Sequence, residues 1–165
     1  MTPGEIFDRI AREHDAMIKR IAASHEMRPH LAEELVQDIY LAIWKALPSF
    51  REDASLRTFV ARIATNRAVT HVVRALKRPP ATALPEDLRA SGDSPETKAI
   101  AQDRQAHLLA AVRQLPLAYR ETVMLALEGL APKEVADVLG ISANAVAIRL
   151  SRGKELLRSL LENIR

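Results

Sequence analysis

Cysteine is absent from this chain of 165 residues, and glycine and aromatic side chains are scarce. Without a thiol the chain cannot form disulfides, thiolate zinc sites, iron–sulfur clusters or a cysteine nucleophile. Five glycines and 4% aromatics, with no clear alternation of β-branched residues, leave little material for a sheet. These absences predict an all-α protein, and they fit a reducing compartment.

Long apolar runs are missing too. No segment approaches the roughly 18 apolar residues of a membrane span, and residues 1–5 lack the start of a secretory signal. The sequence shows no cluster of nucleophile and base and no glycine-rich phosphate loop, and its five histidines lack metal-ligand spacing. We therefore expect a cytoplasmic protein that is not an enzyme and has no metal or other cofactor.

The charge is unevenly distributed along the chain, although the net charge is only +3. Residues 51–78 carry 7 basic and 2 acidic side chains, residues 79–103 carry 2 and 5, and residues 104–165 carry 9 and 6. Two basic modules that flank an acidic connector favour a polyanionic partner, of which nucleic acid is the commonest. The alternative is that these charges only solvate helix surfaces.

Apolar residues recur at helical spacing before the connector. We expect one amphipathic helix over residues 6–21, a second over residues 31–47 and a third from about Ser55, its N-cap, to Arg78. Tyr40 and Trp44 lie on the apolar stripe of the second helix, so we expect them in the core rather than as a DNA-melting wedge. The predicted buried stripe of the third helix consists of Leu56, Phe59, Val60, Ile63, Val69, Val72, Val73 and Leu76.

Residues 79–96 interrupt the helical pattern with four of the nine prolines, Gly92 and four acids. This composition neither continues a helix nor packs a core. We therefore expect two small helical domains, residues 1–78 and 97–165, joined by a flexible linker at 79–96. The second domain should contain helices over about 95–114, 116–128, 132–139 and 142–161, of which the first three begin at a proline.

The segment from Pro132 to Arg152 has the pattern of a helix-turn-helix. This motif needs a small residue where its helices cross and a residue with positive φ in the turn, and Ala136 and Gly140 meet these needs. Ser142 follows as the N-cap of the second helix. The predicted inward residues are Val135, Leu139, Ile141, Val146, Leu150 and Leu157.

The opposite side of that last helix forms an outward surface that we call the recognition face. Arginine and asparagine recognise base edges in the major groove, and lysine binds phosphate. An ordinary αα-hairpin is the alternative, but it does not explain why this side carries the arginines. The recognition face comprises Asn144, Ile148, Arg149, Ser151 and Arg152, with Lys154 on its shoulder.

The third helix carries six Arg or Lys and no acid between Leu56 and Arg78. Like charges four residues apart cost a few tenths of a kcal/mol per pair, so we expect this helix to face phosphates. A solvated helix face is the alternative. The preceding loop, residues 47–55, offers an aromatic ring and hydroxyls on which an unstacked base can lie. We call the outward arginines of this helix, Arg62, Arg67, Arg74 and Arg78, the basic stripe, and Asn66 lies beside them.

Two sets of motifs occur in the order found in a known family. AEELVQDIYLAIW at residues 32–44, then Phe50 and LRTFVARIATNRA at residues 56–68, resemble region 2 of the extracytoplasmic-function (ECF) group of bacterial sigma factors. LPLAYRE, LEGLAPKEVA, LGIS and RLSR, between residues 115 and 152, resemble region 4. The resemblance spans nearly the whole chain, and two modules joined by a proline-rich acidic linker match the minimal architecture of that group.

The resemblance implies a promoter-specificity subunit of RNA polymerase. In the family the polar face of the second helix docks on the clamp helices of the polymerase β′ subunit, and the β flap is a further implied contact. An anti-sigma factor is a further implied partner. Without the resemblance, the four docking residues would be taken as a solvated helix face. They are Glu33, Glu34, Gln37 and Asp38.

The resemblance also divides the DNA contacts between the modules. The third helix and its preceding loop engage the minus-10 element and trap a flipped base, whereas the recognition face contacts the minus-35 element. Phe59, Thr70 and Ala147 depart from the residues usual in the family, so promoter sequence does not transfer. The implied minus-10 residues are Phe50, Ser55, Arg62, Asn66 and Arg74.

Two other classes of protein remain as alternatives: a dimeric helix-turn-helix regulator and an all-helical interaction adaptor. A dimeric regulator needs a dimerisation surface and no strand-separating module. The basic third helix and the long acidic linker therefore favour the sigma-factor interpretation.

Overall fold

The computed structural model describes residues 1–52, 55–78 and 96–163, and within these ranges it contains helices and no strand. This confirms the all-α prediction. The α-helices are α1 (Pro3–Glu13), α2 (Asp15–His25), α3 (Pro29–Ala46), α4 (Leu56–Lys77), α5 (Glu96–Arg113), α6 (Leu117–Leu127), α7 (Pro132–Leu139) and α8 (Ala143–Asn163), and a 3₁₀ turn, η1, spans Leu47–Ser49.

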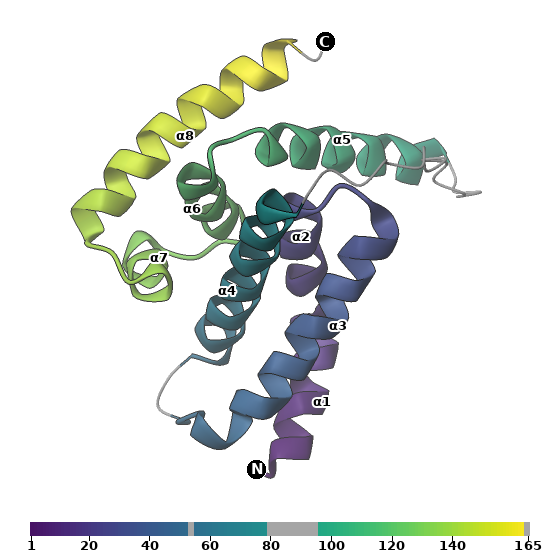
Figure 1. Cartoon of the computed structure of the whole chain (residues 1–165), viewed down its shortest axis with the longest axis vertical. Helices are drawn as coiled ribbons and strands as arrows, with labels where there is room; N and C mark the ends of the chain where they lie inside the picture. Colours follow the sequence, from purple (N-terminus) through teal and green to yellow (C-terminus); the bar gives the residue numbers. More distant parts are fainter. Residues whose placement is uncertain (53–54, 79–95, 164–165) are drawn as a thin grey trace.

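Helices α1 to α4 pack together around α2 (Figure 1). Ile18, Ile21 and Ala22 of α2 are completely buried. Helix α4 packs against α2 and α3 mainly through small side chains, since Ala61, Ala64, Thr65 and Ala68 belong to its buried face. The small side chains allow the backbone of α4 to approach its neighbours closely, while its other side stays outward.

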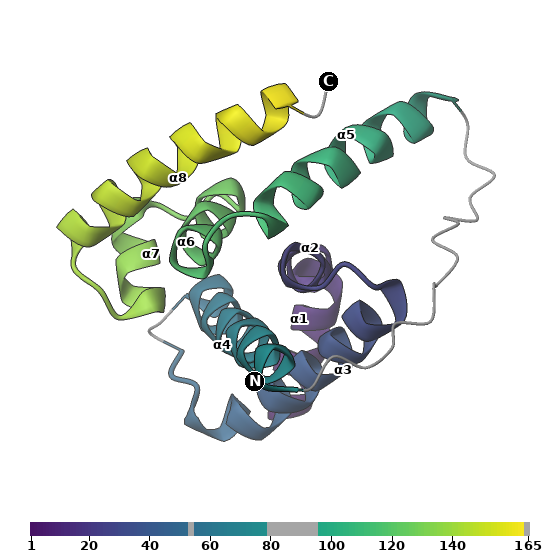
Figure 2. The same ribbon diagram turned by 45° about the horizontal axis from the view of Figure 1, so that its top comes forward.

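Helices α6, α7 and α8 form a second packed group, and α5 bridges the two groups by packing against α2, α6 and α8 (Figure 2). Gly153 lies where α8 crosses α6: a Cβ atom at this position would lie 2.6 Å from Cγ2 of Val123. The crossing therefore requires a residue without a side chain. Figures 1 and 2 show α6 and α7 between α4 and α8.

Polar contacts also join the two groups. The Arg20 guanidinium donates hydrogen bonds of 2.6–2.9 Å to the Glu128 carboxylate, whose side chain is only 4% exposed. Arg113 donates to the carbonyl of Ala23 at 2.7 Å. These contacts hold the second group against α2.

The helix boundaries follow several predicted local signals. Ser55 precedes α4, and its hydroxyl accepts a hydrogen bond from the backbone N–H of Thr58 at 3.4 Å, which confirms the predicted N-cap. Pro132 occupies the first turn of α7 as predicted, whereas Pro116 lies one residue before α6. Pro95 and residues 79–95 of the predicted linker lie outside the described residues.

The first predicted helix is in fact two helices. The chain leaves helical geometry at His14, where φ is −121° and ψ is 4°, and α2 starts at the next residue. Apolar residues continue at helical spacing across this break, and neither glycine nor proline marks it. Periodicity alone therefore could not locate it.

Two predictions about buried residues were wrong. On α4, Val73 and Leu76 are 37% and 80% exposed, because the final turns extend beyond the packed region, and alanines form most of the buried stripe. Trp44 is 50% exposed, with its ring 5.4 Å from that of Phe7 in an edge-on contact. Tyr40 is half-buried beside the same phenylalanine.

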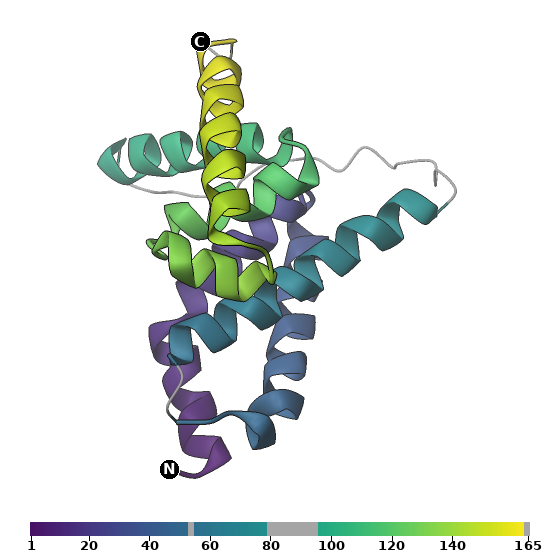
Figure 3. The same ribbon diagram turned by 90° about the vertical axis from the view of Figure 1, so that its left-hand side faces the viewer.

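Figure 3 shows α4 extending beyond the helices that pack against its first half. Its last turns therefore present the end of the basic stripe to solvent. None of the helices among the described residues is long and apolar enough to cross a membrane.

Candidate nucleic-acid interface

The helix-turn-helix has the predicted geometry. Gly140 ends α7 in the left-handed region, at φ 67° and ψ 34°, which a residue with a side chain rarely adopts. Ser142 then accepts a hydrogen bond from the backbone N–H of Ala145 at 3.0 Å and so caps α8. Val135 and Val146 are fully buried between the two helices, and Val138, which the sequence analysis did not include, is also buried.

The recognition face of α8 points outward, with one partial exception. Asn144, Ser151, Arg152 and Lys154 are exposed, and Ile148 is 43% exposed. A hollow between α6 and α8 lies beside this face and is lined by Tyr119, Ile148, Arg149 and Arg152, among others.

Arg149 is the exception. Its side chain is 31% exposed and lies 3.7 Å from the Glu121 carboxylate on α6. Burial raises the pKa of Glu121 above its usual value, while the charge of Arg149 opposes that rise. Arg149 is therefore partly engaged within the protein, whereas Arg152 is free to meet a ligand.

The basic stripe on α4 is divided by its contacts. Asn66, Arg74 and Arg78 are exposed. Arg62 is exposed too, but its Nη2 atom donates to the backbone carbonyl of Asp137 in α7 at 3.0 Å. Nearby, Thr58 lies 3.5 Å from the Glu134 carboxylate, so α7 contacts the start of the stripe without burying it.

Arg67 turns toward α3 rather than outward. Its Nε donates to the Asp38 carboxylate at 2.9 Å, and Nη2 binds the same oxygen. The structure thus joins a residue predicted to bind DNA to one predicted to bind polymerase. Glu33, Glu34 and Gln37 are exposed on α3, as predicted for a docking face.

The loop before α4 holds its aromatic ring against the protein. Phe50 is half-buried, and its ring centroid lies 4.8 Å from that of Phe59 at an interplanar angle of 52°. Ser55 is exposed at the start of α4. Phe59 therefore fixes the Phe50 ring and leaves part of it accessible.

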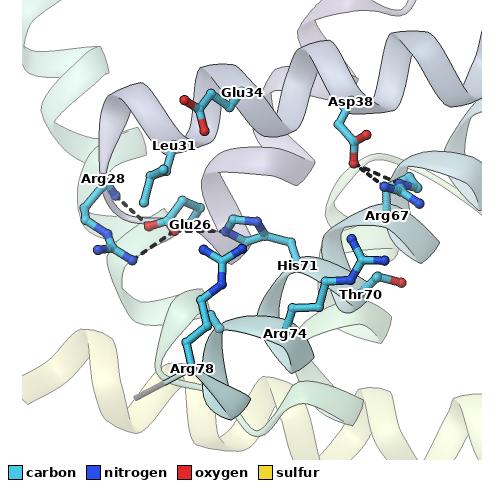
Figure 4. Close-up of a pocket in the computed structure, with 11 residues that line it drawn as sticks. Glu26, Arg28, Leu31, Glu34, Asp38, Arg67, Thr70, His71, Arg74 and Arg78 are labelled. Atoms are coloured by element: carbon cyan, nitrogen blue, oxygen red, sulfur yellow. Dashed lines mark hydrogen bonds and ion pairs between the residues drawn. The ribbon is translucent and has the colours of Figure 1, made fainter. Parts of the chain in front are cut away.

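Residues 26 and 71 form a polar junction that the sequence analysis missed. Glu26, at the end of α2, is 8% exposed and accepts hydrogen bonds from His71 Nε2 and from the backbone N–H of Arg28, both at 2.9 Å (Figure 4). Burial acts to raise the pKa of Glu26, but these hydrogen bonds and the Arg28 charge outweigh it, so the pKa lies below its usual value. No motif signals this contact, because its residues lie 45 positions apart.

Next to that junction, His25 is only 7% exposed. Its Nδ1 lies 2.9 Å from the carbonyl of Ile21, so Nδ1 carries the proton, and Nε2 has no hydrogen-bond partner. Burial lowers the pKa of His25 to about 4. No group of three metal-binding side chains that could hold an ion occurs in the described part of the chain.

Two family models match the chain. Residues 10–78 match Sigma-70 region 2, and residues 106–157 match Sigma-70, region 4. The first match ends with α4, and the second contains the whole helix-turn-helix.

Sigma factors are also found among relatives that align over most of the chain. The ECF RNA polymerase sigma factor SigE of Mycolicibacterium smegmatis is 30% identical over 159 residues, which cover 94% of this chain and 61% of that protein. The RNA polymerase sigma factor NccH of Alcaligenes xylosoxydans xylosoxydans is 28% identical over 166 residues, covering 95% and 87%. The chain thus spans less than two thirds of SigE but most of NccH.

Solved structures agree with this assignment. CnrH in complex with the cytosolic domain of CnrY has a TM-score of 0.68 at 25% identity, covering 95% of this chain and 88% of that one. The sigma factor RpoE with the anti-sigma factor NepR from Bartonella quintana has a TM-score of 0.66 at 20% identity, covering 92% and 93%, and it supports the fold. With regions 2 and 4 matched in order and such relatives along nearly its whole length, the chain belongs to the ECF group of RNA polymerase sigma factors.

Proposed function

We propose that this protein binds core RNA polymerase, directs it to a particular class of promoters and assists strand separation there. One observation carries this proposal: the same chain has an exposed recognition face on α8 and a basic helix α4 that contains no acid. The proposed division of the chain is a polymerase and minus-10 module at 1–78, a linker at 79–96 and a minus-35 module at 97–165. The ranges matched by the two family models support this division.

Within this proposal the recognition face contacts bases of the minus-35 element, with Arg152 and Asn144 at base edges and Lys154 on phosphate. The exposure of these three side chains supports that role. Arg149 contributes less directly, because Glu121 holds it. Exposed Ile148 and Ser151 complete the surface.

The basic stripe holds the phosphates of the minus-10 region, while Phe50, Ser55 and Asn66 surround the flipped base. The part of the Phe50 ring that Phe59 leaves accessible supports a stacking role. Arg62 is exposed, but its Nη2 atom must leave the Asp137 carbonyl to bind a phosphate.

The polymerase contact is assigned to Glu33, Glu34, Gln37 and Asp38 on α3, facing the β′ clamp helices, with the β flap as a second contact. Glu34→Lys is the sharpest test, because Glu34 is exposed, whereas a change at Asp38 would also release Arg67. We expect Glu34→Lys to weaken binding to core enzyme while the fold stays intact. Asp8→Lys is the matched control, since Asp8 is an exposed acid on α1. Equal affinity of the two variants for core enzyme would remove Glu34 from the docking surface.

A protein partner of the anti-sigma kind is part of the proposal. CnrH is structurally known with the cytosolic domain of CnrY, and RpoE with the anti-sigma factor NepR. We propose that such a partner covers the polymerase-docking face of this chain. Co-purification of a chromosomally tagged copy from its own host tests this assignment. The amount of bound partner is compared between the wild type and Glu34→Lys, and we expect less partner with the variant.

The function itself is tested by adding the purified protein to bacterial core polymerase on a library of melted-bubble and duplex templates. We expect start sites that core enzyme alone does not use. If no such site appears and the free protein instead footprints an operator as a dimer, the protein is a helix-turn-helix regulator and the proposal is wrong.

A further inference from the structure

A cavity of about 390 Å³ lies between α3 and α4, at the end of the basic stripe (Figure 4). Its wall includes four arginines, at positions 28, 67, 74 and 78, from two separate parts of the chain. Arg28 comes from the turn between α2 and α3, outside every motif that the sequence analysis assigned to DNA. This cavity therefore adds a basic residue from a second element to the α4 stripe.

The Glu26 junction places Arg28 at the cavity. The buried Glu26 carboxylate accepts from the Arg28 backbone N–H, lies 3.5 Å from its Nη2 and also accepts from His71 on α4. The turn before α3 is thereby tied directly to α4. Figure 4 shows the Arg78 side chain beside this junction, with Arg74 between it and Arg67.

The acids of the cavity leave two arginines without a partner. Asp38 pairs with Arg67, and Glu26 pairs with Arg28 and His71. Within the described ranges, Arg74 and Arg78 form no ion pair, and they lie four residues apart at the end of α4, where like charges repel. The remaining acid, Glu34, is exposed and belongs to the proposed polymerase-docking face, so docking would draw its charge away.

We propose that this cavity is a phosphate-binding site in which Arg28 joins Arg74 and Arg78 around one phosphate group. Guanidinium groups bind phosphate oxygens through paired, charge-assisted hydrogen bonds, and the negative charge of a phosphate would offset the repulsion between Arg74 and Arg78. The phosphate can come from the promoter backbone or from a free phosphorylated molecule. The first source rests on the proposed function, and the second does not.

The promoter source is tested with polymerase holoenzyme by measuring promoter affinity against salt concentration. Each phosphate contact contributes about 0.9 to the slope of log K against log salt, and Arg74 and Arg78 still face this phosphate, so Arg28→Gln should flatten the slope by part of that amount. Arg12→Gln, an exposed arginine on α1, is the matched control and should leave the slope unchanged. Arg28→Lys keeps the positive charge and should retain most of the wild-type slope. This variant separates the loss of a charge that contacts phosphate from disruption of the hydrogen bonds around Glu26.

The free source is tested by titrating the purified full chain with pyrophosphate in a calorimeter. Binding that Arg28→Gln abolishes and Arg12→Gln retains identifies a free phosphorylated ligand. If Arg28→Gln changes neither the promoter slope nor pyrophosphate binding, the phosphate site is wrong, even though the holoenzyme still starts at promoters. If the wild-type protein fails to direct polymerase at all, the proposed function fails, and the pyrophosphate titration alone decides on the site.

Discussion

Helices α4 and α8 are built alike but differ in what covers their basic sides. They are 22 and 21 residues long, and each carries arginines on its outer side, although α4 packs mainly through alanines and α8 through Val146, Gly153 and Leu157. On α4, Arg62 and Arg67 bond to α7 and α3, whereas Arg152 on α8 has no acidic partner among the described residues. Helical periodicity therefore identifies the side of a helix that faces away from its own neighbours, but not what more distant parts of the chain place there.

The largest loss of stability is expected from removing the Arg20–Glu128 contact, which joins α2 to the group formed by α6, α7 and α8. Arg20→Met removes three hydrogen bonds from the Glu128 carboxylate, which is almost fully buried. A buried charged acceptor without a donor costs about 3 kcal/mol of unfolding free energy. Urea unfolding measures this loss.

The control for that experiment is Arg9→Met, which removes an exposed ion pair with Glu13. Exposed pairs of this spacing contribute under about 0.5 kcal/mol, so the control should unfold almost like the wild type. Similar losses in both variants would show that the contact between the groups contributes no more than a surface pair does.

The second expected effect is a dependence of the unfolding free energy on pH, caused by the buried His25 on α2 in the helical group that contains α4. The pKa of His25 is about 4, so the folded protein takes up this proton far less readily than the unfolded chain, whose histidine has a pKa near 6.5. The stability is therefore complete above about pH 6.5 and falls as the pH drops toward 4, by roughly 2 to 3 kcal/mol.

Unfolding free energies at pH 7 and pH 5 check this expectation, with His25→Gln as the comparison. The unfolding free energy of His25→Gln should fall less between pH 7 and pH 5 than that of the wild type, because the glutamine side chain takes up no proton. The lowered pKa values of Asp15 and Glu26 act on both proteins alike at lower pH. Parallel pH profiles would mean that His25 does not titrate as a buried group.

The sequence predicted the helices and the recognition face because local signals determine them. Gly140 at the turn, Ser142 at the cap and the apolar spacing of Val135 and Val146 each act over a few residues. The break at His14 was not predicted, because the apolar spacing of a helix continues through it. The packing of α4 through alanines was not predicted either, because alanine ranks low among hydrophobic residues.

The electrostatic partners of the interface could not be predicted either. Arg20 and Glu128 are 108 positions apart, and Arg62 bonds to a backbone carbonyl 75 positions away. Such contacts depend on how the helical groups pack, which periodicity does not encode. The outward residues of α8 were identifiable because, apart from Glu121 at Arg149, no distant segment engages them within the described part of the chain.

The third prediction compares loss of an arginine on each helix. Arg152→Ala should weaken promoter binding by roughly 1 to 3 kcal/mol at particular upstream base pairs, as loss of a base contact does. Arg78→Ala should weaken all promoters about equally and flatten the salt dependence by about one unit. Holoenzyme affinities for single-base-pair variants at several salt concentrations measure both. The opposite pattern would mean that α4 recognises bases and α8 holds phosphates.

The smallest effect concerns how the two helices pack. Gly153→Ala gains about 1 kcal/mol of helix propensity but places a methyl group 2.6 Å from Val123 Cγ2, and overpacking costs roughly 1 to 3 kcal/mol, so we expect a net loss near 1 kcal/mol. On α4 the reverse exchange, Ala64→Gly, should also destabilise by about 1 kcal/mol, because the buried alanine already fits. In a double-mutant cycle, Val123→Ala should remove most of the penalty of Gly153→Ala, since it takes away the clashing atom. Stabilisation by Gly153→Ala alone would show that the α6–α8 crossing has room for a side chain, and that α8 packs by the same means as α4.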